Sequence, residues 1–336
     1  MNLPLSILDL ATIVEGTTAS DTFRASVEVA RYAEERGFLR YWFAEHHNLL
    51  TIASSSPAVL IAHIAAHTER IRVGAGGVML PNHSPLVIAE QYGTLERLHP
   101  GRIDLGLGRA PGGDHPVFAA LRRSPNAADR FPEDVLELQA LFGPAQPGQK
   151  VEAVPATGTR VPLYILGSSL FGAQLAAALG LPYAFASHFA PGSLEEAVTL
   201  YRREFRPSEQ LAAPYVITAM NVYAADSPDE AARLYRSHLR NMALHLITRT
   251  GEPPPVVNEE ALFASPAGRH AQQMLHYSAI GTPGTIRAEV ERFARHSQAD
   301  EVIIVTNIAD TTARLRSFEI VADEALSIPT PSRLRS

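Results

Sequence analysis

Hydrophobic and polar positions along the chain follow two patterns that alternate in a fixed order. A short apolar run predicts a buried strand, and the stretch after it has apolar residues three and four positions apart, which predicts a helix. In the first unit, residues 5–10 carry the strand pattern, and residues 20–37 place Val27 and Ala30 on one helical face before Gly37. The chain therefore begins with a strand followed by a helix.

This unit recurs to the end of the chain. Further strands are predicted at residues 39–45, 71–80, 102–107, 162–167, 181–187, 215–224 and 301–307. The helices after them are predicted at 57–68, 85–98, 129–142, 168–180, 193–205, 228–247 and 311–325, with an extra helix at 284–297. Eight strand–helix units without a hairpin signal are what a closed parallel barrel requires. We therefore predict an α/β fold, a single-domain (β/α)8 TIM barrel over residues 1–330 with a tail at 331–336.

Two segments interrupt the repeat, residues 108–127 and 250–270, and both are rich in glycine, proline and alanine. Loops after the strands of such a barrel form its C-terminal face, where active sites lie. We expect both segments to be loop insertions at that face, with 250–270 as a candidate lid. A disordered insertion without a role is the alternative for the second segment.

Composition narrows the class of protein. The 336 residues are 46% hydrophobic and 19% charged, which indicates a globular chain with a large core. The net charge of -6 argues against nucleic acid or an anionic membrane as partner. The absence of cysteine excludes disulfides and thiolate chemistry. No apolar segment is long enough to span a bilayer and the N-terminus has no basic signal region, so we expect a cytoplasmic protein.

The first candidate for chemistry is the run Glu45, His46 and His47 at the end of the second strand. Histidine titrates near neutral pH and suits general acid–base catalysis, although hydrogen-bonded structural histidines remain the alternative. Adjacent strand residues point to opposite sides, so the two histidines do not converge on one metal ion. We expect no metal site.

The second candidate is the glycine content of residues 73–85 and 103–114. Neither segment opens directly into a helix, which disfavours a dinucleotide-binding fingerprint. Glycines such as Gly76 and Gly77 allow the backbone to approach a flat ligand closely, because they carry no Cβ.

The third candidate is an anion site. Gly167, Ser168 and Ser169 lie between a strand and a helix start, where free backbone N–H groups and the helix dipole favour a phosphate. An ordinary helix cap by one of the serines is the alternative. Arg109, just past the fourth strand, is a candidate to contact the same phosphate.

Four stretches, "AEHHN", "VGAGGVMLPNHSPL", "HPGRIDLGLGRAPGG" and "ILGSSLFGAQLAAALGLP", resemble in that order the bacterial luciferase-like flavin-dependent monooxygenases, and are most similar to the non-luminescent branch. The resemblance covers nearly the whole chain. It implies a (β/α)8 barrel, usually dimeric, that binds reduced FMN or, in other branches, the deazaflavin F420.

Carried over by motif, the resemblance places His46 near the reacting edge of the flavin, with Glu45 and His47 beside it. It implies a cis peptide between Gly76 and Gly77 under the flavin ring. It also assigns phosphate-binding positions to a further pair, Arg109 and Ser168. Where luciferase has a cysteine and a glutamate, this chain has Gly108 and Gly167, which argues against light emission.

These inferences lead to a hypothesis about function. A two-component monooxygenase would take FMNH2 from a separate flavin reductase and use O2 to oxidise a small organic substrate; the chain shows no nicotinamide fingerprint of its own. Two alternatives remain open, an F420-dependent hydride-transferring oxidoreductase and a non-catalytic flavin-binding protein. We expect a homodimer.

Overall fold

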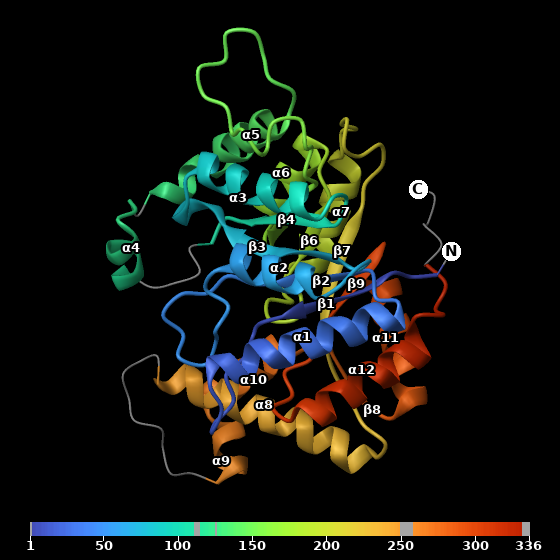
Figure 1. The fold of residues 1–336 in the computed structure, drawn as a ribbon. Helices are drawn as coiled ribbons and strands as arrows, with labels where there is room; N and C mark the ends of the chain where they lie inside the picture. Colours follow the sequence, from blue (N-terminus) through green and yellow to red (C-terminus); the bar gives the residue numbers. More distant parts are fainter. Residues whose placement is uncertain (1, 111–114, 125, 249–257, 331–336) are drawn as a thin grey trace.

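The computed structural model describes residues 2–110, 115–124, 126–248 and 258–330, and its centre is a closed barrel of eight parallel strands (Figure 1). Each strand pairs with the next, and the last pairs with the first. The barrel strands are β1 Leu5–Asp9, β2 Arg40–Phe43, β3 Arg72–Met79, β4 Ile103–Gly108, β5 Leu163–Gly167, β6 Tyr183–Phe185, β7 Val216–Ala224 and β9 Glu301–Val305. The prediction of a single-domain TIM barrel is confirmed. The expected tail at 331–336 lies outside the described residues.

Helices surround the barrel (Figure 1). They are α1 Ala19–Arg36, α2 Pro57–Ala66, α3 Pro85–Leu98, α5 Phe131–Phe142, α6 Leu170–Leu179, α7 Leu194–Glu204, α8 Pro228–Thr248, α11 Pro283–His296 and α12 Thr311–Ala325, with short 3-10 turns η1 Leu80–Asn82 and η2 Ala127–Arg130. Local sequence sets the limits of α1. Thr18 and Asp21 form a reciprocal capping box at its start, and Gly37 ends it in the left-handed conformation at φ 89°. No described helix is long and apolar enough to cross a membrane.

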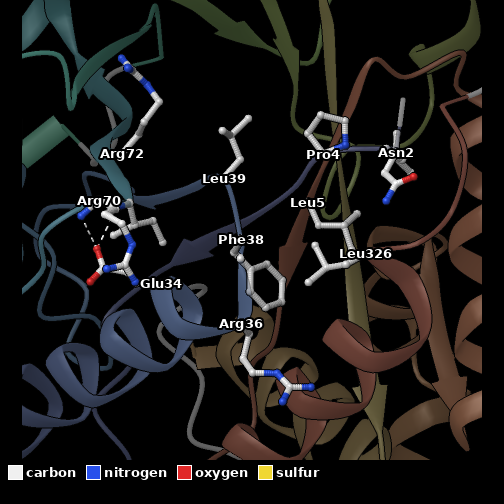
Figure 2. A pocket seen from close by; sticks show the side chains of 13 residues that line it. Asn2, Pro4, Leu5, Glu34, Arg36, Phe38, Leu39, Arg70, Arg72 and Leu326 are labelled. Carbon is white, nitrogen blue, oxygen red and sulfur yellow. Dashed lines mark hydrogen bonds between the residues drawn. The ribbon is translucent and has the colours of Figure 1, made fainter.

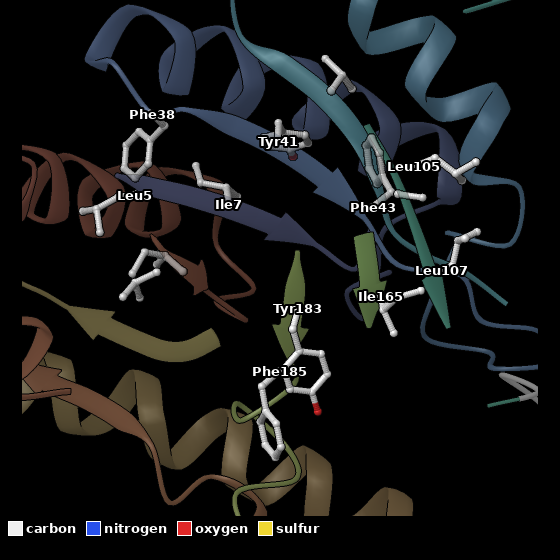
Figure 3. Close-up of a cluster of buried hydrophobic side chains, with 14 of the residues drawn as sticks. Leu5, Ile7, Phe38, Tyr41, Phe43, Leu105, Leu107, Ile165, Tyr183 and Phe185 are labelled. Carbon is white, nitrogen blue, oxygen red and sulfur yellow. The ribbon is translucent and has the colours of Figure 1, made fainter. Parts of the chain in front are cut away.

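Side chains that alternate along each strand pack into two hydrophobic cores, one between the strands and the helices and one inside the barrel. Ile7, Tyr41 and Phe43 point outward and pack beneath the helices (Figure 3). Leu8 and Trp42, the neighbours of these residues in sequence, point into the barrel interior. This alternation follows from the pleat of a strand, and burial on both faces explains why the strands read as continuous apolar runs.

Three elements depart from the sequence prediction. A ninth strand, β8 Ser278–Gly281, pairs only with residues 221–224 of β7 and lies outside the closed barrel. The segment 108–127, expected to be a loop, contains α4 His115–Leu121. The candidate lid at 250–270 lies partly outside the described residues; from residue 258 it forms α9 Glu259–Ala264 and the start of α10 Pro266–Met274.

The two helices α9 and α10 are not a loop because they bury apolar side chains against α8. Leu262 and Ala271 from α9 and α10 pack with Leu239 and Ala243 of α8. Asn258 and Ser265 cap the two helices through their side chains. The expectation of a loop is therefore wrong for residues 258–270, because composition masked two short capped helices whose burial depends on α8. The role of a lid stays a prediction.

A network of charged side chains crosses the barrel interior. The guanidinium of Arg40 donates to both carboxylate oxygens of Glu301, at 2.7 and 2.9 Å, and to Asp104 at 2.8 Å. Arg72 also donates to Asp104, with its Nε 3.0 Å from Oδ1. Burial by itself would raise the pKa of Asp104, but Arg40 and Arg72 hold that pKa below its ordinary value. Two arginines therefore balance two carboxylates away from water.

Replacing Arg40 by methionine should destabilise the protein by about 3–5 kcal/mol, because two buried carboxylates lose their partner. The measurement is the free energy of unfolding in urea, followed by circular dichroism. Arg292→Met is the matched control, since Arg292 pairs with Glu289 on the surface of α11, and should cost less than about 1 kcal/mol. Equal losses in the two variants would show that the interior network does not stabilise the barrel.

Candidate active site

The residues singled out from the sequence gather at one end of the barrel. Glu45 follows β2, Arg109 follows β4 and Ser168 follows β5, each just past the last residue of its strand. Because all barrel strands are parallel, their C-terminal ends open at the same face. TIM-barrel active sites lie at this face.

Glu45 is the centre of a hydrogen-bonded group. Its Oε1 accepts from the ring nitrogens of His47 at 2.8 Å and His83 at 2.7 Å, and its Oε2 accepts from the backbone N–H of Met79 at 3.0 Å. The carboxyl group is 1% exposed. Burial by itself would raise the pKa of Glu45, but these donors lower it below its ordinary value, so the group is a carboxylate at neutral pH.

His46 does not share in this group. Its backbone N–H donates to the carbonyl of Ser54 at 2.9 Å, and its ring Nδ1 is buried without a hydrogen-bond partner among the described residues. Burial lowers the pKa of His46 below its ordinary value; the charge of Glu45 opposes this shift and His47 adds to it. The imidazole is therefore neutral at pH 7 and has an unused ring nitrogen.

His83 was missed by the sequence reasoning. It directly follows the short turn η1, and nothing in the sequence around it distinguishes it from an ordinary turn residue. Its pairing with Glu45, 38 positions earlier, depends on the adjacency of β2 and β3 in the barrel.

The peptide bond between Gly76 and Gly77 is cis, as the family resemblance implied. A Cβ on Gly76 would lie 2.8 Å from the Trp42 ring, and one on Gly77 would lie 2.7 Å from the carbonyl oxygen of Gly106. No side chain fits at either position. The two glycines, in the second half of β3, thus make room for Trp42 of β2 and for the backbone of β4.

Two other glycines of the same segments are crowded in the same way. A Cβ on Gly74 would meet Asp104 at 2.5 Å, and one on Gly106 would meet the carbonyl oxygen of Ala75 at 2.3 Å. All four glycines therefore make room for neighbouring strands. Close approach of a flat ligand to Gly76 and Gly77 stays a prediction.

Arg109 reaches the start of α6. Its guanidinium carbon lies 4.3 Å from the ring centroid of Phe171, in the first turn of that helix. Ser169 occupies the N-cap position, but its side chain makes no capping hydrogen bond. The ordinary cap considered as an alternative is therefore absent at Ser169. The helix start keeps free backbone N–H donors beside a cation, which favours an anion.

Two further histidines at this end were also missed. His188 follows β6 and His238 lies on α8. Burial lowers the pKa of His188 to about 3, with smaller contributions from His46 and His238, and lowers that of His238 to about 4. Both rings are therefore neutral at pH 7. Isolated histidines in apolar surroundings have no sequence signature, so only the fold reveals them.

A surface depression also lies at the opposite end of the barrel, where β1, β2 and β3 begin (Figure 2). Its polar groups are already paired: Glu34 accepts from the backbone N–H groups of residues 69–71, and Arg72 binds Asp104. We therefore place the candidate active site at the other end. Within the described ranges, no group of three or more His, Asp or Glu side chains could hold a metal ion.

Comparison with known proteins adds to this geometry. The sequence pattern of a family described as luciferase-like monooxygenase matches residues 3–301. A luciferase-like monooxygenase of Escherichia coli (strain K12) is 48% identical over 323 residues, which cover 96% of each chain. The N-acetyl-S-alkylcysteine monooxygenase of Bacillus subtilis (strain 168) is 32% identical and covers 96% of this chain and 98% of its own.

Solved structures show the same architecture. The crystal structure of apo-MsnO8 is 34% identical, covers 98% of this chain and 100% of its own, and superposes with a TM-score of 0.83. At 17% and 15% identity the fold alone is shared with a 3,6-diketocamphane monooxygenase constituent in complex with FMN and with an F420-dependent secondary alcohol dehydrogenase. Their TM-scores are 0.74 and 0.71, and they cover 99% and 98% of this chain and 100% and 99% of their own.

The neutral histidines predict a pH dependence of stability. A histidine whose pKa is depressed on folding takes up a proton when the chain unfolds, so its contribution is complete above about pH 6.5 and is lost as the pH falls toward the folded pKa. For His188 and His238 the free energy of unfolding should fall by roughly 1.4 kcal/mol per pH unit each between pH 6.5 and about 4. Urea unfolding at several pH values measures this slope.

Carboxylates also contribute to the slope of the unfolding free energy with pH, and the variants His188→Gln and His238→Gln isolate the contribution of each histidine. Each variant should lower that slope by the amount that corresponds to one proton, roughly 1.4 kcal/mol per pH unit. An unchanged slope in both variants would mean that these rings are protonated in the folded protein.

Proposed function

Because the chain belongs to the luciferase-like monooxygenase family, we propose that it is a two-component monooxygenase that uses reduced FMN and O2 to oxidise a small organic substrate. One observation carries the proposal. The bare Gly76–Gly77 backbone, the cation at the start of α6 and the neutral ring of His46 all lie at the C-terminal end of one barrel.

The residues present fit the phosphate of FMN. A dianion beside Arg109 would receive charge-assisted hydrogen bonds from the guanidinium, and the first-turn N–H groups of α6 would donate to its other oxygens. Gly167 leaves space there, since a Cβ on it would meet nothing nearer than the Gly172 Cα, at 4.0 Å. Ser168 adds a hydroxyl next to this space.

The residues also fit a flat ring. Gly76 and Gly77 would hold the isoalloxazine by backbone alone, with the ring of Trp42 supporting Gly76 from inside the barrel. His46 would then face the reacting edge. Glu45 would act on the site indirectly, because it positions His47 and His83.

The chemistry follows from these placements. Bound reduced FMN supplies the electrons with which O2 inserts one oxygen atom into the substrate and releases the other as water. In this proposal the unused Nδ1 of His46 exchanges a proton with the reacting groups, since a neutral imidazole both accepts and donates near neutral pH. The buried carboxylate of Glu45 keeps His47 and His83 in place and supplies negative charge nearby.

Several finer points remain predictions. We expect a separate flavin reductase to supply FMNH2, and a homodimer. An N-acetyl-S-alkylcysteine is a rational first trial substrate, because a relative is named for that activity. F420 is the alternative cofactor; it would replace monooxygenation by hydride transfer, and titration with both cofactors distinguishes them.

Replacing Arg109 by alanine should weaken FMN binding by about 1.5–3 kcal/mol, the range for a hydrogen bond to a charged group. Riboflavin has no phosphate, so its affinity should not change. Fluorescence titration of both ligands measures the difference. Arg292→Ala, on the surface of α11, is the control. Unchanged FMN affinity, or equal weakening of FMN and riboflavin, would rule out this phosphate site.

Replacing His46 by alanine should lower product formation by about 10²–10⁴-fold, the usual contribution of a general acid–base group, while FMN still binds. His47→Ala should have the smaller effect. The assay is single-turnover oxidation of the trial substrate with prereduced FMN, alongside FMN titration of each variant. If His46→Ala oxidises the substrate as fast as the parent protein, His46 is structural.

A further inference from the structure

A second set of polar side chains lies at the same end of the barrel and has no part in the flavin site proposed above. The set, which we name the β7 cluster, comprises His188, Tyr223, His238 and Thr306. Exposed fractions of His188, Tyr223 and Thr306 are 9%, 0% and 2%. Within the described part of the chain, each of the four has a buried polar atom without a hydrogen-bond partner: His188 Nδ1, His238 Nε2 and the two hydroxyl oxygens.

Contacts connect His188 and His238 to the C-terminal half of β7, and Thr306 follows the neighbouring strand. Asn221, in this half, donates from its side chain to the backbone carbonyl of His188 at 2.7 Å. Two positions further on the same strand face, the ring of Tyr223 lies 6.0 Å from that of His238, with 30° between the planes. Thr306 directly follows β9, whose last residue, Val305, pairs with Asn221.

The cluster is also close to His46. A charge on His46 would lower the pKa of His188, so the two rings lie within electrostatic range. The Nδ1 of His46 is itself buried and unpaired. Within the described residues, unpaired polar atoms thus occur at or just after the C-terminal ends of β2, β6, β7 and β9, and on α8.

Buried polar atoms in folded proteins are almost always hydrogen-bonded, because an unpaired one loses its hydration without compensation. Other exceptions occur elsewhere in the described chain, one each on Tyr32, Tyr92, Glu96, Arg202 and Arg314. Several such atoms at the one face where TIM barrels bind ligands indicate a group that arrives from outside.

We propose that the β7 cluster binds an uncharged oxygen-bearing group of the organic substrate, a hydroxyl, carbonyl or amide, and holds the substrate across the barrel opening from His46. This inference rests on the proposed function. Neutral imidazoles and hydroxyls each offer a donor and an acceptor, which such a group can satisfy.

Charged groups match the cluster less well. His188 and His238 are neutral at pH 7, since burial lowers their pKa values to about 3 and about 4. The cluster therefore has no positive charge to hold a carboxylate. It contains no acidic side chain to hold an ammonium group.

The first test uses shape-preserving variants, Tyr223→Phe and Thr306→Val, in FMN-free protein. Each removes one hydroxyl that has no partner among the residues that the structure describes, so the urea midpoint of unfolding should stay the same or rise. A clearly lower midpoint for both variants would mean that the hydroxyls bind permanent structural water, and would overturn the proposal.

The second test is calorimetric binding of four probes on one carbon skeleton: cyclohexanecarboxamide, cyclohexylmethanol, cyclohexanecarboxylate and cyclohexylmethylammonium. The amide and the alcohol should bind more tightly than the two ions. Tyr223→Phe and Thr306→Val should each weaken them by about tenfold, the effect of one lost hydrogen bond. Tyr32→Phe makes the same chemical change on α1 and should have no effect.

Tighter binding of either ion, no binding of the uncharged probes, or equal affinity in the parent protein and both cluster variants would overturn the proposal. FMN titration of the same variants separates it from the flavin proposal, because their FMN affinity should be unchanged. Failure of the parent protein to bind FMN, with cluster-dependent amide binding intact, would refute the flavin function and leave the polar site standing.

Discussion

The guanidinium of Arg40 is the group on which the barrel interior depends. It joins β2 to the carboxylates of β4 and β9, Asp104 and Glu301, and to the hydroxyl of Tyr164 on β5. Asp104 in turn accepts from the indole N–H of Trp42 at 3.1 Å. The ring of Trp42 occupies the space that a Cβ on Gly76 would need. A charge balance inside the barrel is therefore connected, contact by contact, to the backbone that we propose lies under the flavin.

Burial disfavours the charged form of both Glu45 and the histidines at the barrel opening, but the outcome differs. Glu45 keeps its charge because two imidazoles and a backbone N–H donate to it. His46, His188 and His238 lose theirs because the charges near them do not offset the cost of burial. The opening thus combines one carboxylate with neutral rings, an arrangement suited to moving protons and binding uncharged groups near neutral pH.

The candidate phosphate site joins two consecutive strand–helix units. Arg109 comes from the end of β4, and the ring of Phe171 against which it stacks comes from the helix after β5. Stacking holds a flexible side chain near the helix start without consuming its hydrogen-bond donors. The cation and the helix dipole therefore act on the same small volume.

The sequence by itself determined the barrel, its unit order, and the position of Glu45, His46, the glycine pair and Arg109 at strand ends. These follow from local periodicity and from the rule that parallel strands share one open face. Only the tertiary structure decided that Glu45 binds His47 and His83 rather than His46. It also revealed β8, the packed helices α9 and α10, and the buried rings of His188 and His238. Such features depend on contacts between residues far apart in the chain, and the local sequence pattern does not predict those contacts.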